Sequence, residues 1–288
     1  MADNLHDDIV EHLDWIQSTI SQVDTSSQQV QKELLAMLQQ QIARFEIKDG
    51  RFIASQDLRQ RMVIIEQKFE DILTGKLYTN AIKDYLGTFS TIAEVNATLH
   101  QNYNDLQVKA SLLEPARRVV YEQAREAMYG SGIDSQFKEP VKHLLLQKVT
   151  TGASISDMEK ILDRWTTGDL SGRQDTFGKP LPNLSQYNSQ VARDTSYQFN
   201  GTVNQIIKEE YGLDGIKYVG GTVRDSRPLC VHLVNLRRDI SNEELAKFLE
   251  DPNLKPGRIP GTTVENFCTY RGGYNCIHGA FPIRMQSK

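Results

Sequence analysis

The spacing of apolar residues near the N-terminus is the feature that most constrains the fold of this chain. Between Ile9 and Met37 these residues recur at alternating steps of four and three, and Ser27 fills the one polar position. A repeat of 3.5 residues keeps an apolar stripe along one side of a helix, where another helix can cover it. The sequence therefore predicts a long N-terminal helix with one seam, formed by Ile9, Leu13, Ile16, Ile20, Val23, Val30, Leu34 and Met37.

A second helix with the same spacing follows a polar turn. The turn lies at Lys48-Asp49-Gly50, and apolar residues between Leu58 and Ile72 again recur at helical steps. Two such helices joined by a short turn form an antiparallel hairpin or part of a bundle. Two uses of the seam remain open at this stage: it packs within the chain, or it docks on helices of another subunit.

The middle of the chain is also predicted to be helical. Gly87 is expected to break one helix, and Pro115 is expected to begin another, because proline suits the first helical position. Ser156 and Glu159 form a capping-box pattern at the start of a third helix. We expect helices at 82–106, 115–129, 141–149, 156–165 and 185–210, with a loop at 168–182.

The C-terminal part has a different character, because glycine, proline, arginine and aromatic residues increase. Residues 216–219 are typical of a short strand, Ser241 caps a helix that runs to Glu250, and the tail from Pro252 is expected to pair a few short strands. The expected fold is mainly α with a small α+β C-terminal part and an N-terminal helical hairpin or bundle. We divide it into a helical region at 1–134, used for docking or as a bundle, and a domain at 135–288; a boundary near 184 is the alternative.

Composition and charge limit the classes of function. No run approaches the roughly 18 apolar residues that a membrane span needs, and three cysteines in 288 residues do not form a disulfide framework, which favours a reducing compartment. The formal net charge of −4 argues against a general DNA-coating protein, yet residues 215–288 carry 11 Lys and Arg against 7 Asp and Glu. Arg237 and Arg238 are therefore candidates for non-specific DNA contact, with ordinary surface variation as the alternative.

Three sequence blocks follow one another in the last third of the chain. The first, Tyr187–Thr195, lies on a predicted helix; the second, Gly220–Cys230, contains Asp225-Ser226-Arg227; the third, Arg271–His278, is followed by Pro282-Ile283. This series resembles the phage head morphogenesis family, the minor head proteins that include the Mu F-like proteins. That family shows an Arg-x-Thr helix, an Asp-x-Arg…Cys turn and a Gly/Pro-rich segment ending in Asn-Cys-Arg-Cys or Asn-Cys-Arg-His.

The resemblance covers roughly residues 141–283 and implies a structural protein of a tailed bacteriophage that is not an enzyme. Such a minor capsid protein binds the portal protein, the inner capsid or the scaffold, assists head assembly, and handles packaged DNA. Its implied location is the virion, inside the head or at the portal vertex, and the host cytoplasm during assembly. The N-terminal helices carry no motif of the family.

Four residues of the first two blocks predict a structural brace. Arg193 and Thr195 match the arginine–threonine pair of the family, and Asp225 and Arg227 match its turn. An aspartate in a turn accepts backbone N–H groups, and an arginine can pair with a carboxylate through two hydrogen bonds. We expect the brace to fix the helix to the strand region; contact of Arg227 or Arg224 with phosphate or with a carboxylate of the portal is the alternative.

Cysteine and histidine also cluster in the last two blocks. Cys230, Cys268, Cys276 and His278 supply the four ligands of a tetrahedral structural zinc site, although their spacing lacks a close C-x₂-C pair. A histidine in place of the last cysteine of the family pattern preserves ligation. Buried thiols without metal, and a Cys230–Cys276 disulfide formed outside the reducing cell, remain open.

Two enzymatic interpretations stand beside the structural one. A metal-dependent nuclease would use His278, Asn275 and Asp225, and an ADP-ribosyl-transferase-like toxin domain would use Arg193 and Glu265. No paired catalytic spacing supports either of them. Convergence of these side chains on an open cleft would favour an enzyme, whereas mutual burial would favour a structural role.

Overall fold

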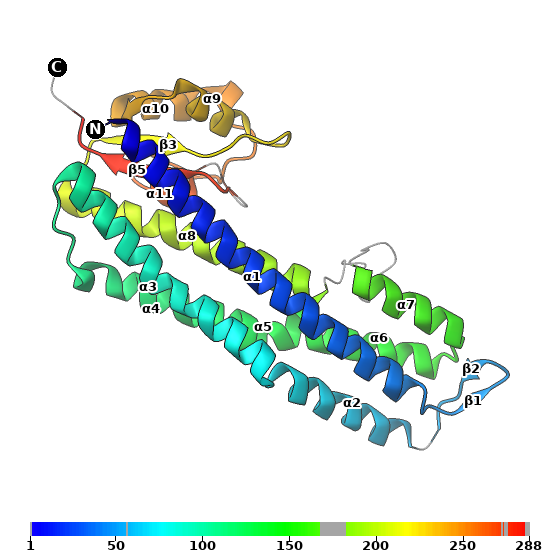
Figure 1. Ribbon diagram of the computed structural model, residues 1–288. Coiled ribbons are helices and arrows are strands. Elements are labelled where there is room, and N and C mark those ends of the chain that lie inside the picture. The colour runs from blue at the N-terminus through cyan, green and yellow to red at the C-terminus, as the bar shows by residue number, and fades with distance from the viewer. Residues whose placement is uncertain (1, 56, 168–182, 272, 274–275, 286–288) are drawn as a thin grey trace. The chain divides into compact units, whose positions relative to one another are not determined.

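The computed structural model describes residues 2–55, 57–167, 183–271, 273 and 276–285. The protein is mainly helical with a small antiparallel sheet near the C-terminus (Figure 1), which confirms the expected fold class. The chain forms two compact units, the first from residues 1–19, 87–122 and 193–288, and the second from 20–86 and 123–192. Each unit combines segments from both sides of residue 134, so the compact units do not follow the boundary expected there.

The elements have the following bounds. The longer helices are α1 (Ala2–Ile42), α2 (Leu58–Leu73), α3 (Lys76–Asn104), α4 (Ala110–Tyr129), α6 (Glu139–Thr150), α7 (Ile155–Thr167) and α8 (Leu184–Tyr211). The shorter ones are α5 (Ser131–Ile133), the π-helical η1 (Asp134–Lys138), α9 (Pro228–Leu236), α10 (Asn242–Glu250), the 3₁₀-helical η2 (Pro252–Leu254) and α11 (Phe267–Tyr270). The strands are β1 (Ile47–Lys48), β2 (Arg51–Phe52), β3 (Gly215–Val219), β4 (Asp239–Ser241) and β5 (Gly279–Ile283). Within the described part of the chain, the helices are too short or too polar to cross a membrane.

The N-terminal seam is buried along its whole length. All eight of its apolar side chains are at most 8% exposed. Ser27, the polar position of the seam, is buried as well, and its hydroxyl oxygen accepts a hydrogen bond of 2.9 Å from the Asn188 side chain of α8. The seam therefore packs within the chain, and the alternative of a docking face for another subunit loses its support.

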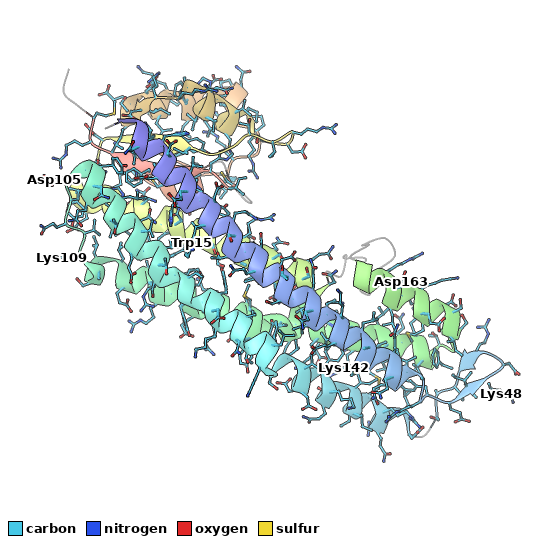
Figure 2. All side chains as sticks on the ribbon, in the orientation of Figure 1. Trp15, Lys48, Asp105, Lys109, Lys142 and Asp163 are labelled. Carbon is cyan, nitrogen blue, oxygen red and sulfur yellow. The ribbon has the colours of Figure 1, made fainter. Side chains whose placement is uncertain are left out.

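In the second unit a tight hairpin follows α1, at the polar turn that the sequence predicts. Asp49 and Gly50 have φ angles of 51° and 73°, the left-handed backbone that a two-residue hairpin requires. Lys48 stands exposed beside this turn (Figure 2). Ion pairs join α2 to α6 and to η1, with Lys142 3.0 Å from Glu66 and Lys138 2.9 Å from Glu70. Such exposed pairs add little stability, so the buried seam is the main support of this unit.

Two helix boundaries differ from those expected. Gly87 lies inside α3, because one glycine costs a helix only about 1 kcal/mol and the neighbouring Tyr85, Leu86 and Phe89 are buried. Pro115 lies inside α4, which begins five residues earlier at Ala110, because the first turn buries Leu113.

Two further expectations are corrected in detail. The cap of α7 is Ser154 rather than Ser156, since the Ser154 hydroxyl accepts a hydrogen bond of 3.0 Å from the Asp157 backbone N–H. In the described part of the tail β5 is the one strand, where a few were expected. The Ser241 cap of α10 is confirmed, because its hydroxyl accepts from the Glu244 N–H. The loop expected at 168–182 lies outside the described residues.

The C-terminal sheet has β3 at its centre, between β4 and β5, and all pairs are antiparallel. Tyr218 lies opposite Ala280 on the face that α9 and α10 cover (Figure 1). The other face carries Phe281, whose ring stacks on His100 of α3 at 4.2 Å. Gly279 on this face approaches the Leu13 side chain of α1. The sheet is thus a layer between two groups of helices of the first unit.

A chain of buried polar side chains crosses the helices of this unit. His12 Nε2 of α1 lies 3.0 Å from Asn200 Oδ1 of α8, and Asn96 of α3 donates to the same oxygen at 2.8 Å. Asn204, one turn further along α8, donates to Asn96 Oδ1 at 2.8 Å. Each of the four side chains is at most 5% exposed. Buried amides are stable only when their hydrogen bonds are made, so this chain fixes the register of three helices.

The chain of hydrogen bonds continues to the sheet. His100 Nε2 lies 3.0 Å from Asn204 Oδ1, and Asn104 Nδ2 lies 2.9 Å from His100 Nδ1. Asn104 also donates to the Pro282 carbonyl of β5 at 3.0 Å and accepts from the Arg284 N–H at 3.2 Å. We call the set of His12, Asn96, His100, Asn104, Asn200 and Asn204 the polar ladder.

The two histidines of the ladder are neutral. Burial lowers the pKa of His12 and of His100 from 6.5 to about 4, against a smaller opposing effect of their hydrogen bonds with Asn200 and Asn204. The neutral form of His100 suits its partners, because Nε2–H donates to an oxygen while Nδ1 accepts from an amide. A second proton on Nδ1 would face the N–H of Asn104. Protonation of this ring therefore breaks the ladder.

Stability should fall as the pH falls from about 6.5 to about 4. In this window the unfolded chain binds protons on both histidines and the folded chain does not, so acid favours unfolding. His100→Gln should remove up to about 1.4 kcal/mol per pH unit from the slope of unfolding free energy against pH. Denaturant unfolding at several pH values measures this slope. His143→Gln changes an exposed histidine and should leave the slope as it is; equal slopes for all three proteins would contradict the prediction.

Candidate functional site

One face of α8 supports the C-terminal loops. Arg193, Tyr197, Gly201 and Gln205 follow one another at steps of four, which places them on one side of the helix. The Gln205 side chain accepts a hydrogen bond of 3.2 Å from the Cys268 N–H at the start of α11. This face therefore holds α11 and the segment after it, where the third sequence block begins.

Arg271 is the buried anchor of this segment. It is 3% exposed, and its Nη1 donates to the Tyr197 carbonyl at 2.7 Å and to the Cys268 carbonyl at 3.3 Å. Its φ of 41° ends α11 in a left-handed turn. Gly201 makes room for it, because a Cβ there would lie 2.2 Å from Arg271 Nη1 and from the Cys268 oxygen. The sequence patterns did not predict this contact, although a glycine inside a long predicted helix was the available signal.

A second cluster lies behind this anchor and joins the second and third blocks. Cys230 comes from α9, Tyr218 from β3, and Cys276 and His278 from the segment before β5. Cys276 Sγ lies 3.4 Å from His278 Nδ1, and the Tyr218 hydroxyl lies 3.4 Å from Cys230 Sγ and 3.6 Å from Cys276 Sγ. All four residues are at most 5% exposed. We call this set the thiol cluster.

The His278 ring depends on a close backbone approach. It stacks on Tyr218 at 5.4 Å with the two planes 16° apart. Gly220, at a φ of 146°, has no side chain to obstruct it, and a Cβ there would lie 2.6 Å from the ring. Gly220 at the start of the second block is therefore required, because a side chain at this position would collide with His278 of the third block.

The pKa values of the two thiols in the cluster are shifted in opposite directions. The hydrogen bond from the Cys230 thiol lowers the pKa of Cys276 well below its usual value, and the bond with His278 adds to this effect against the cost of burial. The same Cys230–Cys276 bond, together with burial, raises the pKa of Cys230. Burial also raises the pKa of Tyr218. Cys276 is thus the more acidic thiol of the pair, and the thiolate is the form that binds metal.

The cluster has the dimensions of a tetrahedral metal site. Cys230, Cys276 and His278 offer three ligand atoms within 4.8 Å of one another. Zinc bonds of about 2.3 Å to sulfur and about 2.0 Å to nitrogen place a sulfur ligand and a nitrogen ligand about 3.5 Å apart, close to the 3.4 Å between Cys276 Sγ and His278 Nδ1. The Tyr218 hydroxyl lies beside the two sulfurs. His278 Nε2 is the weakest element of the fit, because it is buried without a hydrogen-bond partner in the described structure.

The fourth ligand expected from the sequence, Cys268, is not part of the cluster. It lies on α11, fully buried, where its N–H donates to Gln205 of α8. Burial raises the pKa of the Cys268 thiol to about 11, so it behaves as an apolar core side chain. The structure thus brings together three of the four predicted ligands and adds Tyr218, which the sequence analysis did not consider.

Part of the predicted brace is absent among the described residues, and the brace as a whole stays a prediction, since Thr195 and Arg227 both have interactions within the structure. No hydrogen bond joins Arg193 to Asp225 in the described structure, and Asp225 is exposed on the turn after β3. Arg227 instead lies along two loops, since a Cβ on Gly257 would come within 2.8 Å of its side chain and one on Gly273 within 3.5 Å. The position that fixes α8 to the C-terminal segment is Arg271. Thr195 lies on α8 beside Arg193.

The DNA-contact candidates lie close to acidic groups. Arg238 pairs with both carboxylate oxygens of Glu244, one of them at 2.7 Å, and half of its side chain is exposed. Arg237 ends α9 in a left-handed turn and lines a surface recess with Asp7 and Asp239. These carboxylates reduce the positive potential that a DNA phosphate would meet. DNA contact by these two arginines stays a prediction.

The residues of the two enzymatic interpretations are dispersed among the described positions. His278 is buried in the thiol cluster, whereas Asp225 and Glu265 are exposed on separate loops. Asn275 lies outside the described residues. Comparison with models of protein families, with curated proteins and with solved structures gives no match to this chain.

Two glycine-to-alanine changes inside helices should have opposite effects. Gly201→Ala should destabilise the protein by about 1 to 3 kcal/mol, because the added methyl group collides with Arg271 and with backbone. Gly87→Ala should stabilise it by up to about 1 kcal/mol, because a Cβ there meets nothing within 4 Å. Thermal or denaturant unfolding measures both. If Gly201→Ala leaves the free energy of unfolding unchanged, Arg271 does not occupy the space beside Gly201.

Proposed function

We propose that this protein is a structural, non-enzymatic minor head protein of a tailed bacteriophage. In this role it binds the portal protein, the inner capsid or the scaffold during assembly in the host cytoplasm, and remains in the virion near the packaged DNA. The motif resemblance of residues 141–283 motivates the proposal. The observation that carries it is that residues of all three blocks come together in the first unit, with Arg193 as the residue from the first block.

The three blocks meet although they are far apart in the sequence. Arg193 of the first block lines the same pocket as Arg271 and Cys276 of the third. Cys230 of the second block forms a hydrogen bond with Cys276. The Cys230–Cys276 contact and the bonds of Arg271 to backbone carbonyls maintain the fold, and this supports a structural role over a catalytic one.

We also propose that the thiol cluster holds a structural zinc ion. Its three protein ligands and the adjacent Tyr218 are all at most 5% exposed, and this burial favours a structural role for the ion over a catalytic one. The ion would tie α9 to the segment before β5. A measurement must distinguish the zinc-bound cluster from two alternatives: paired thiols without metal, and a Cys230–Cys276 disulfide.

Virion assembly tests the proposed role. Expressed together with the portal, scaffold and capsid proteins of the same phage genome, the protein should sediment with assembled heads. Omission of the portal protein distinguishes the portal from the inner capsid as the binding site. Complete heads that leave the protein in the soluble fraction would refute the proposal, and so would DNA cleavage with Mg²⁺ or Mn²⁺, or transfer of ADP-ribose from NAD, by the purified protein.

Metal analysis tests the zinc site. Freshly purified protein should contain about one zinc per chain, and Cys276→Ser should lose it together with thermal stability. Cys268→Ser is the matched control, because it changes a buried thiol outside the cluster and should keep the metal. Protein without zinc, or a Cys276→Ser variant that retains it, contradicts the site; loss of thiol reactivity that dithiothreitol restores identifies the disulfide.

A further inference from the structure

A pocket of about 350 Å³ lies between α8 and the C-terminal segment of the first unit. Its size is at the lower end of the range for small-ligand sites. Two arginines from separate elements line it, Arg193 from α8 and Arg271 from the end of α11. The other described lining residues are Asp194, Tyr197, Gln198, Ile259, Thr269, Tyr270, Gly273 and Cys276.

Both arginines have unused hydrogen-bond donors. Nε of Arg193 and Nε of Arg271 are buried, and neither has a hydrogen-bond partner in the described structure. Arg271 as a whole is 97% buried, and its Nη1 bonds only to backbone carbonyls. A buried N–H group without a partner costs about 1 to 3 kcal/mol, and more when it is charged. The two guanidinium groups that line the pocket are therefore not fully satisfied by protein acceptors.

The charge of the pocket indicates the sign of that ligand. Neither arginine forms an ion pair with a carboxylate among the described residues. Asp194 is the one acidic residue of the described lining, against two guanidinium groups. Buried charges in proteins are usually paired, and an unpaired buried guanidinium is costly. An anion in the pocket removes this cost.

We propose that this pocket binds a phosphate group. Guanidinium groups that approach from two elements offer donors in different directions, which suits the tetrahedral arrangement of phosphate oxygens. The pocket is larger than one phosphate ion, so the group can be free phosphate or part of a nucleic acid backbone. Phosphate recognition here does not rest on the proposed virion role, because the pocket and its donors belong to this chain alone.

Calorimetric titration of the full chain with inorganic phosphate tests the proposal. Wild-type protein should bind phosphate, and its melting temperature should rise in phosphate relative to chloride at equal ionic strength. Arg193→Gln should weaken binding at least tenfold, while Arg193→Lys, which keeps the charge, should weaken it less. Arg118→Gln is the matched control, because Arg118 is exposed on α4 and does not line the pocket; it should bind like the wild type.

Two further ligands identify the source of the phosphate. A trinucleotide without terminal phosphate offers only phosphodiesters: if it binds in an Arg193-dependent way, the site takes nucleic acid backbone, and if only inorganic phosphate binds, the site takes free phosphate. Acetate that binds as tightly as phosphate would overturn the phosphate assignment. Absence of phosphate binding by the wild type, or equal binding by a folded Arg193→Gln variant as judged by circular dichroism, would overturn the proposal.

Discussion

The first unit depends on a chain of buried hydrogen bonds rather than on apolar packing alone. All the amides of the polar ladder except the half-buried Asn104 are removed from water, so any shift that breaks one of their bonds leaves a buried polar group unsatisfied. Apolar seams tolerate small slips, whereas amide pairs such as Asn96–Asn204 require one register. Because Asn104 ends the ladder on β5, the register of the helices also fixes the position of the sheet.

The polar ladder also fixes the position of α8, and α8 in turn positions the residues of the candidate site. Asn200 and Asn204 face the ladder, while the neighbouring Gly201 faces Arg271 and the thiol cluster behind it. On α8, Asn200 thus belongs to the core of the unit, while the adjacent Gly201 contacts the candidate site. Arg271 reaches the Tyr197 carbonyl only because Gly201 has no side chain. If α8 were rotated about its axis, Gly201 would no longer lie opposite Arg271.

The features that the sequence predicted are those that short-range patterns determine. The seam of α1, the Asp49-Gly50 turn and the Ser241 cap each depend on neighbours a few residues away. Candidate ligands could be named from residue type, but which of the three cysteines meet could not, because it depends on the tertiary packing of α9, α11 and the segment before β5. The ladder was missed because asparagine and histidine at helical steps look like a solvated face until their partners are known.

The discontinuity of the first unit has a consequence for how it folds. Its central strand, β3, pairs with β5, and the start of α1 packs on β5 at Gly279. About 260 residues separate Thr19 from Gly279, which the ribosome needs roughly 15 to 50 s to add. During that interval the apolar residues at the start of α1 lack their final contacts with β5. The N-terminal segment therefore completes its packing only after β5 emerges, and chaperones have time to act on it first.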